Sequence, residues 1–569
     1  MESVSVARLH VRKTFSIASY LFLIPIVSIG LLLRLHSLGF VTESLWYEDG
    51  AFITQAYSLG IESVWTPFSY LFVYHRLVAL IARELPLIWA PYIFFVAWLF
   101  VFFLIVWVLK SRAKLIDIDP LSVLLVILAI TFQPSQGEAW FNLNQSHCTL
   151  GIALSLYVCI PTKKPASVTE ILFLLIASLS DVSSIVLTMV LVLQLILLRD
   201  FSVRKATYIL VPAGALVEGV FLFSSHRVQQ GGVDLKLEDW LHVVWTLLTF
   251  GGTSIPIYVI SILFWTVTLI YVVRWSVFER AGLDRIPWLS PLFAIAVAAL
   301  MFFVSGVAEG SGLRDLNPMD MESRYCLVPY SLLFFAAFVC TKDRKSVQIG
   351  LACLVGIICA LEFVTVDRDD REASTGLLAH TNMQWTAFAK FQEIKSDLVI
   401  PINSPLPIYP PEPFVQISRR AEVRESSFVL TPGLQSAALG PTLQFDIGKY
   451  CPTNKYIGLE FDIWRERMGA ARVNWTDGRS VSSEKSLDRF YPAGPVTMQF
   501  AFRRDISDSI VEFYPALGVA DSRVVRTFTK LRSEAKGTDT SLYPGATFAE
   551  RTPAGGKVKI EQTRVFCLE

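Results

Sequence analysis

Apolar stretches long enough to cross a lipid bilayer recur along the first two thirds of this chain. A membrane-crossing helix takes about 20 apolar residues, because each residue advances about 1.5 Å through a hydrocarbon core of roughly 30 Å. Of the 569 residues, 53% are hydrophobic and only 17% are charged, so the sequence predicts a polytopic α-helical membrane protein. Runs that reach or approach the required length lie at 15–38, 86–109, 255–274, 288–306, 326–340 and 347–364, and shorter ones at 116–132, 146–161, 168–180, 184–198 and 206–223.

Lysine and arginine gather at every second junction between these apolar stretches. Short loops rich in these residues stay on the cytoplasmic side of a membrane. We therefore expect a cytoplasmic N-terminus and an extracytoplasmic position for everything after residue 365. The basic junctions are Arg8, Arg12 and Lys13; Lys110, Arg112 and Lys114; Lys163 and Lys164; Arg199, Arg204 and Lys205; Arg274 and Arg280; and Lys342, Arg344 and Lys345.

The segment 168–198 joins two of these basic junctions. The segment could be one long helix, but both of its ends should lie on the same side of the membrane, so two passes are needed. We interpret it as two short helices that turn at SDVSS (180–184), which brings the prediction to about eleven transmembrane helices.

After residue 365 the composition changes to that of a soluble domain. A proline-rich stretch, PINSPLPIYPPEP (401–413), is typical of an extended connector. Short alternating runs such as KYIGLEFDIW (455–464) and VTMQFAF (496–502) then follow between turn signals, as in an antiparallel β-sandwich. The sequence thus predicts three parts: a membrane domain at 1–364, a connector at 365–414, and a jelly-roll-like, carbohydrate-binding-like β-sandwich at 415–569.

Two of the eight cysteines fall in this last part. Cys451 and Cys567 would lie in an extracytoplasmic domain, where disulfides persist. A bridge between them is the favoured interpretation, and two separate buried thiols are the alternative.

The first outward loop carries the most unusual motif, WYEDGAFITQAYSLG (46–60). Glu48 and Asp49 follow each other there, with Trp46 beside them and His75 and Arg76 further along the same loop. One interpretation is that the carboxylates are simply solvated outside the lipid. The other is that aromatic, cationic and acidic groups together bind a sugar and an anionic group.

Three stretches give the chain a family resemblance: EDGAFITQAYSLG (48–60), SYLFVYHRLVALIARELP (69–86) and EAWFNLNQSH (138–147). With an acidic motif after the first span, many spans and a β-rich C-terminal domain, the chain resembles the C-type glycosyltransferase superfamily, and more narrowly a group of uncharacterised bacterial membrane proteins usually assigned to it. The resemblance covers the membrane half in outline, and the C-terminal domain in architecture only.

The resemblance implies an integral membrane enzyme that uses a polyprenyl-phosphate-linked sugar. In that superfamily the loop-one carboxylate is proposed to deprotonate the acceptor hydroxyl or to help hold a divalent metal, such as Mg or Mn, while the lipid phosphate leaves with inversion. Neighbouring residues on a helix point in different directions, so one of the two carboxylates faces the cavity, and we favour Asp49 as the base. Gly50 departs from the bulky residue that commonly follows the acidic pair.

Arginines near the outer ends of the spans are candidates for binding the phosphate. These are Arg76, Arg227 and Arg324, of which Arg324 is favoured because Tyr325 follows it, as the resemblance implies. Each could instead be an interfacial arginine that reaches toward lipid headgroups. His75 could support the same phosphate or cap a helix that starts at Leu77.

Other polar residues on the outward side complete the candidate set. Glu138 and Asn142 in loop 133–147 suit sugar hydroxyls, or else they pair with their own loop. Asp181 in the 180–184 turn and Glu218 at membrane depth are functional candidates because burial of a charge in lipid is costly.

The sequence lacks a P-loop, a Rossmann glycine fingerprint, an HExxH motif and a CxxC pair, and its net charge of +1 predicts no nucleic-acid partner. We expect a glycosyltransferase of a bacterial inner membrane, with a glycan, lipid-linked or protein acceptor. The alternatives are a transporter or flippase for lipid-linked sugars, a polysaccharide polymerase, and a membrane-anchored polysaccharide assembly protein.

Overall fold

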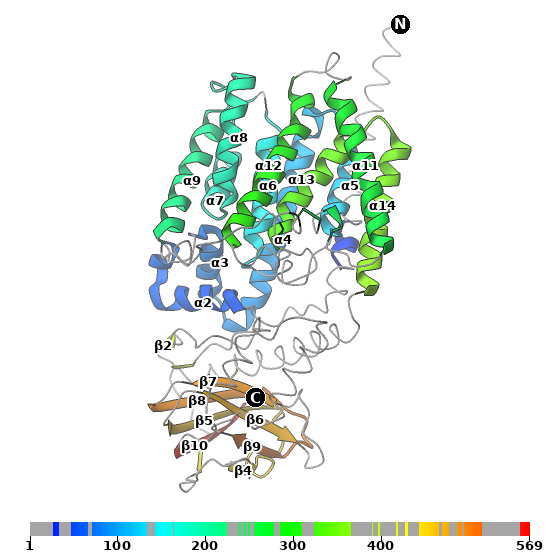
Figure 1. Ribbon diagram of the computed structural model, residues 1–569. Coiled ribbons are helices and arrows are strands. Elements are labelled where there is room, and N and C mark those ends of the chain that lie inside the picture. The colour runs from blue at the N-terminus through cyan, green and yellow to red at the C-terminus, as the bar shows by residue number, and fades with distance from the viewer. Residues whose placement is uncertain are drawn as a thin grey trace, which may run out of the picture. The chain divides into compact units, whose positions relative to one another are not determined.

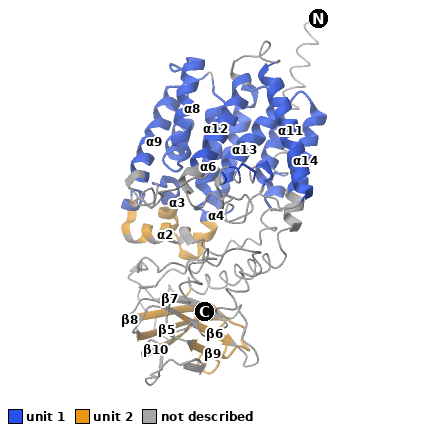
Figure 2. Cartoon of the chain, viewed as in Figure 1, with its two compact units in different colours: residues 1–40, 62–78, 94–366 blue, residues 41–61, 79–93, 367–569 orange. Residues whose placement is uncertain are grey.

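The chain divides into two compact units, one made of residues 1–40, 62–78 and 94–366 and the other of residues 41–61, 79–93 and 367–569 (Figure 2). The structure is a computed structural model (Figure 1). It describes residues 25, 27–32, 47–65, 71–133, 141, 143–162, 164–224, 238, 241, 244–245, 248–250, 255–277, 285–309, 324–365, 390, 397–398, 417–418, 427–430, 443–465, 469–476, 486–491, 494–514 and 558–568.

Within the described residues, helices coincide with the apolar stretches from residue 86 onward. They are α4 (Ala90–Arg112), α5 (Pro120–Thr131), α6 (Ser146–Cys159), α7 (Val168–Ser178), α8 (Ser183–Leu198), α9 (Lys205–Ser224), α11 (Ile255–Val277), α12 (Arg285–Glu309), α13 (Arg324–Cys340) and α14 (Lys345–Thr365). Before them come α2 (Tyr47–Leu59) and α3 (Val73–Arg83), and short 3₁₀ helices lie at η1 (Gly60–Trp65), η2 (Leu87–Trp89) and η3 (Ala113–Leu115).

Three stretches in the described part of the chain are long and apolar enough to cross a membrane: Leu87–Leu115, Lys205–Leu222 and Ile255–Val277. The described apolar segments of the other helices that follow apolar runs are 10 to 17 residues long. The fold is therefore mostly helical and of membrane type. Most of the predicted first span at 15–38 lies outside the described residues.

The segment 168–198 consists of two helices, as predicted. Ser167 caps α7, because its side chain accepts from the backbone N–H of Glu170 while the Glu170 side chain bonds back to the backbone of Ser167. The chain then turns through residues 179–182, and α8 ends where Arg199 adopts a left-handed conformation with φ of 53°.

Helix α6 lies at the centre of the helical unit. Every residue of it except His147 is buried. Helices α7, α8, α12 and α13 pack against it, and their apolar side chains join one hydrophobic cluster. A helix that is apolar on all sides belongs in a core rather than at a surface.

Helices α7 and α9 approach each other at a glycine. A Cβ atom added to Gly214 of α9 would lie 2.5 Å from Cβ of Ser178 and 2.7 Å from its backbone oxygen. Small residues allow such close helix contacts in membranes, where packing is a main source of helix association.

The C-terminal unit contains two four-stranded antiparallel sheets. One sheet has the order β3-β10-β5-β8, and the other has the order β4-β9-β6-β7. The strands are β3 (Ser427–Leu430), β4 (Leu443–Asp446), β5 (Tyr456–Arg465), β6 (Gly469–Thr476), β7 (Ser486–Tyr491), β8 (Gly494–Arg503), β9 (Ile510–Tyr514) and β10 (Val558–Leu568). A separate two-stranded pair joins β1 (Asp397–Leu398) to β2 (Ile417–Ser418).

Alternate residues of the two sheets meet in one core, so the unit is a β-sandwich. On β5, Ile457, Leu459, Phe461 and Ile463 are all buried. The ring of Phe461 stacks on Phe513 of β9 with centroids 3.7 Å apart. This period of two is the alternation predicted from the sequence.

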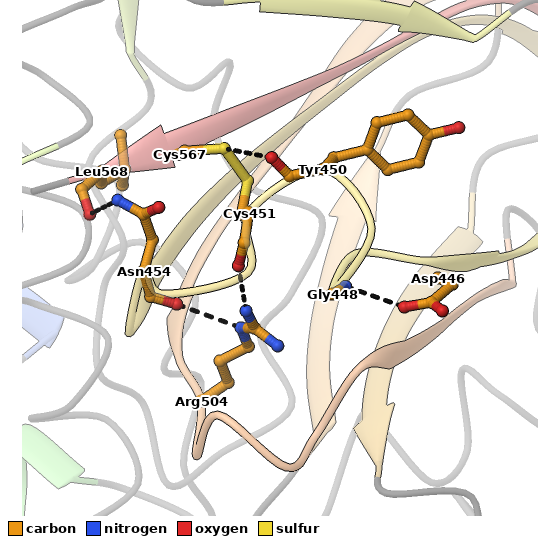
Figure 3. Close-up of a disulfide and its surroundings, with 8 residues drawn as sticks. All are labelled: Asp446, Gly448, Tyr450, Cys451, Asn454, Arg504, Cys567 and Leu568. Atoms are coloured by element: carbon orange, nitrogen blue, oxygen red, sulfur yellow. Dashed lines mark hydrogen bonds between the residues drawn. A yellow bond between two sulfur atoms is a disulfide. The ribbon is translucent and has the colours of Figure 1, made fainter.

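Cys451 and Cys567 form a disulfide with a Cα–Cα distance of 5.4 Å (Figure 3). It ties β10 to the loop before β5. Arg504, which is buried, also binds this loop, because its guanidinium donates to the backbone oxygens of Cys451 and, at 3.1 Å, Asn454. The pairing is the one that the sequence analysis favours over two separate thiols.

Replacing Gly214 by Ala should destabilise the helical unit by about 1–3 kcal/mol, because the new methyl group overlaps Ser178. The matched control is Gly219→Ala on the same helix, where an added Cβ meets nothing within 4 Å. Thermal unfolding of the detergent-solubilised protein measures both changes. Equal melting temperatures for the two variants would contradict the close packing of α7 and α9.

Replacing both Cys451 and Cys567 by Ser should lower the stability of the sandwich by about 2–5 kcal/mol, since the bridge closes a sequence separation of 116 residues. Mass spectrometry of the non-reduced, digested protein should recover the two cysteine peptides as one linked species. Recovery of both cysteines as free thiols from protein exported by cells would count against the bridge.

Candidate functional site

The chain enters α3 through an unusual backbone turn that other elements hold in place. Phe72 adopts a left-handed conformation with φ of 54°, directly before α3 starts at Val73. The N–H of Tyr74 donates to Oγ of Ser180 at 2.9 Å. The α7–α8 turn thus supplies an acceptor to the first turn of α3, whose N–H groups have no partner inside the helix.

Glu218 of α9 holds the residue just before this turn. Its Oε2 accepts from the backbone N–H of Leu71 at 3.1 Å, and the side chain is fully buried. Its other oxygen, Oε1, makes no hydrogen bond to the described residues. Among the described residues, Glu218 therefore makes a hydrogen bond through one of its two carboxyl oxygens.

His75 points from the first turn of α3 toward the start of α6. Its Nε2 lies 3.0 Å from the backbone oxygen of Asn144 and 3.0 Å from Oγ of Ser146. The helix begins at Val73 rather than at Leu77, so the expectation that His75 caps it is wrong. The side chain instead connects α3 to the N-terminal end of the central helix α6.

The partners of His75 determine where its proton lies. Burial is the main cause that lowers the pKa of His75 well below its usual value, and His147 and Arg76 lower it further. The ring is therefore neutral at pH 7. A carbonyl oxygen can only accept, so the bond to Asn144 requires the proton on Nε2. His75 in this state cannot take a proton from Ser146, which argues against a serine–histidine nucleophile pair.

His147 adds a second imidazole to the same place. Its Nδ1 lies 2.5 Å from the backbone oxygen of Asn144, and its Nε2 lies 3.3 Å from Sγ of Cys148. The rings of His75 and His147 have centroids 6.0 Å apart, and the ring of Phe72 contacts both edge to face. Asn144 thus anchors two histidines through one carbonyl.

Arg76 is buried with 1% of its surface exposed, so it does not reach toward lipid headgroups. Its Nε donates to the backbone oxygen of Leu71 at 3.0 Å, and its Nη1 donates to that of Ser63 at 2.6 Å. Burial lowers the pKa of Arg76 to about 10, which leaves it charged at neutral pH. Much of the guanidinium is therefore used to bind the backbone that precedes α3.

Asp181 lies in the turn between α7 and α8 and is 4% exposed. Its Oδ1 accepts from the backbone N–H of Ser183 at 2.7 Å. The carboxyl group rests against α6, since a Cβ on Gly151 would lie 2.9 Å from Oδ1. Asp181 and Glu218 also interact electrostatically, so the helical unit contains two coupled buried carboxyls.

Asp49 on α2 belongs to the other compact unit and is 2% exposed. The interpretation of Asp49 as a solvated loop carboxylate is therefore wrong. Buried aspartates in proteins almost always have partners, because an unpaired buried charge is costly. Glu48 lies in the same helix, and its side chain is outside the described part.

The remaining predicted site residues are less informative. Arg324 and Tyr325 are the first residues of α13, and their side chains are not among those described. Trp46, Glu138, Asn142 and Arg227 lie outside the described residues. Among the side chains that are described, no three or more His, Cys, Asp or Glu residues form a group that could hold a metal ion, so the divalent metal stays a prediction.

The sequence analysis did not assign roles to Ser146, Asn144 or Ser180. Ser146 is the first residue of an apolar helix, a common place for a serine to bond to nearby groups. That pattern could have marked it as a polar end of a buried helix. Its partner, His75, lies 71 residues away in the sequence. No local pattern around Ser146 indicates that the two residues meet.

Comparison of the chain with protein-family models, with curated proteins and with solved structures finds no match to any of them.

Stability should depend on pH through Asp181. Burial raises the pKa of Asp181 from 3.8 to about 6, so the folded protein holds this proton more tightly than the unfolded chain does. The resulting stabilisation is complete below about pH 4 and is lost as the pH rises through about 6, in all about 3 kcal/mol. Asp181→Asn should remove the part of this dependence that Asp181 contributes.

The measurement is the melting temperature between pH 4.5 and 7.5 in detergent. Asp343→Asn, which changes an exposed aspartate between α13 and α14, is the control and should follow the wild type. Parallel curves for the wild type and Asp181→Asn would show that Asp181 does not carry the titration.

Proposed function

We propose that this protein is a membrane glycosyltransferase that moves a sugar from a polyprenyl-phosphate donor to an acceptor on the extracytoplasmic face. The acceptor classes are a surface glycan, a lipid-linked glycan and a protein. The proposal includes about eleven transmembrane helices and a bacterial inner-membrane location, with the β-sandwich outside the cytoplasm.

The burial of Asp49 is the observation that carries this proposal. A surface loop carboxylate needs no burial, whereas a general base works best where water is excluded and its basicity is tuned. Asp49 is 2% exposed on a helix that is not one of the membrane-crossing stretches. It is also the residue that the resemblance to the C-type superfamily singles out.

The proposed reaction uses Asp49 as the base. Its carboxylate takes the proton of the acceptor hydroxyl, and the hydroxyl oxygen forms a bond to the anomeric carbon. On the opposite face the bond from that carbon to the phosphate oxygen breaks, and polyprenyl phosphate leaves with inversion. Cationic groups must balance the leaving phosphate, and Arg324 at the start of α13 is the favoured one, because Arg76 donates to two backbone oxygens.

The architecture of the C-terminal unit supports the same proposal. Its two sheets interleave eight strands in the β3-β10-β5-β8 and β4-β9-β6-β7 orders, which is the arrangement of a jelly roll. Jelly rolls include many lectin domains. In the proposal this domain positions the acceptor glycan.

One observation favours the alternative of a transporter for lipid-linked sugars. Asp181 and Glu218 are buried, electrostatically coupled carboxyls, and such groups within membrane proteins often belong to proton relays. In that case sugar movement, rather than sugar transfer, would depend on these two residues and not on Asp49.

Asp49→Asn should abolish transfer, because removal of a general base typically costs a factor of about 10²–10⁴ in rate. The measurement is surface-glycan composition by mass spectrometry in cells that carry the wild type, Asp49→Asn or a deletion. Glu62→Gln is the matched control, since Glu62 is an exposed carboxylate of the same predicted loop.

The glycosyltransferase proposal predicts that the deletion and Asp49→Asn lose the same sugar at normal protein level, while Glu62→Gln keeps it. If Asp49→Asn retains the sugar and Asp181→Asn or Glu218→Gln loses it, the result favours the transporter over the glycosyltransferase. If the deletion leaves the glycans unchanged, both are wrong.

A further inference from the structure

The C-terminal end of α6 is bound by two polar side chains from neighbouring elements. Arg112, at the end of α4, donates through Nη1 to the backbone oxygens of Tyr157 at 3.3 Å and Ile160. Gln194 of α8 donates to the backbone oxygen of Val158 at 2.9 Å. These bonds satisfy carbonyl groups that the helix leaves without partners.

A second arginine, Arg204, binds the side chain of Gln194. Arg204, just before α9, donates through Nη1 to Oε1 of Gln194 at 2.9 Å. The same nitrogen lies 3.4 Å from Oδ2 of Asp200 and 3.4 Å from the hydroxyl oxygen of Tyr208. The side chains of Arg112 and Arg204 are only 3% and 1% exposed. Two guanidinium groups are thus buried near one another at the end of the bundle.

Part of each guanidinium makes no hydrogen bond to the described residues. For Arg204 these atoms are Nε and Nη2, and for Arg112 the atom is Nε. Nε and Nη2 form one edge of the guanidinium plane with two parallel N–H bonds. That edge is the one that binds carboxylate or phosphate through two hydrogen bonds.

The nearby carboxylates are already occupied. Glu170 accepts from Arg112 and from Tyr157 on Oε1, and from Ser167 on Oε2. Asp200 accepts a 2.7 Å bond from Tyr208 on Oδ1 and reaches Arg204 through Oδ2 at 3.4 Å, toward Nη1 only. Neither carboxylate satisfies the Nε–Nη2 edge of Arg204, although buried N–H groups in proteins are nearly always paired.

We propose that Arg112 and Arg204 form a binding site for a phosphate-class oxyanion at this end of the helical unit. The donors proposed for its oxygens are the N–H groups without a hydrogen bond to the described residues, on the Nε–Nη2 edge of Arg204 and on Nε of Arg112. The side chains of Glu170 and Asp200 at the rim are 19% and 20% exposed, so the cluster borders the protein surface. The site is independent of the proposed glycosyl transfer.

The anion has two possible sources, a lipid headgroup or free phosphate. The cluster lies at the basic junctions that contain Lys110, Lys164 and Lys205, where the sequence predicts the cytoplasmic headgroup region. Both sources offer the same phosphate oxygens, so the experiment must separate them.

The test measures the melting temperature of the full-length protein in detergent with two probes. One is inorganic phosphate compared with chloride at equal ionic strength, and the other is phosphatidylglycerol compared with phosphatidylcholine in the micelle. The variants are Arg204→Gln and Arg204→Lys. Arg199→Gln is the control, because it removes an exposed arginine from the same junction.

We expect at least one probe to raise the melting temperature of the wild type and of Arg199→Gln by several degrees. A shift with phosphate identifies a soluble anion, and a shift with phosphatidylglycerol alone identifies a headgroup. The shift should vanish in Arg204→Gln, and Arg204→Lys should need about tenfold more probe because it keeps the charge and loses the paired N–H edge.

The proposal is overturned if neither probe stabilises the wild type, a result that depends on no variant. It is also overturned if Arg204→Lys responds at the same probe concentration as the wild type. Should Arg204→Gln fail to fold, these two results still decide the matter.

Discussion

A helix surrounded by apolar neighbours has no water at either end to satisfy its terminal N–H and carbonyl groups. Helix α6 is in this position, since all of it except His147 is buried. The protein must therefore bring polar groups to both ends of α6. Much of the polar chemistry in the helical unit follows from this single requirement.

The two ends are satisfied in different ways. At the N-terminal end, the backbone N–H groups of Ser146 and Cys148 donate to the backbone oxygens of Leu143 and Gln145. The neutral ring of His75 adds contacts to Ser146 and to the carbonyl of Asn144. At the C-terminal end, the charged Arg112 meets the carbonyls of Tyr157 and Ile160. Cations suit this end because the helix dipole places partial negative charge there. The first cluster joins α3 to α6 through neutral groups, and the second is the proposed anion site.

The sequence predicted those features that depend on local composition. Helices follow the apolar runs, and the 168–198 hairpin follows from the charges at its ends, because length and charge act directly on membrane insertion. Strands such as β5 follow from the alternation of buried and polar residues. The burial of Asp49, His75 and Arg76 did not follow, because burial of a loop residue depends on contacts with distant parts of the chain.

Arg76 illustrates this limit. As a sequence feature it is an arginine at the outer end of a span, which favours a phosphate ligand or a headgroup contact equally. In the structure it binds the carbonyls of Ser63 and Leu71, and Leu71 lies directly before the turn at Phe72. Nothing in the local pattern marks a backbone carbonyl as a partner, since every residue has one.

The place of β10 in its sheet has a consequence for biosynthesis. Residues 558–568 form the last of the described strands along the chain, yet β10 lies between β3 and β5. During synthesis, β3 and β5 therefore exist before the strand that separates them, and each presents an open edge. The sheet that contains β3 and β5 cannot be completed until this segment has been made. The domain should thus depend on whatever protects unpaired strand edges in its compartment for longer than a sheet built from consecutive hairpins.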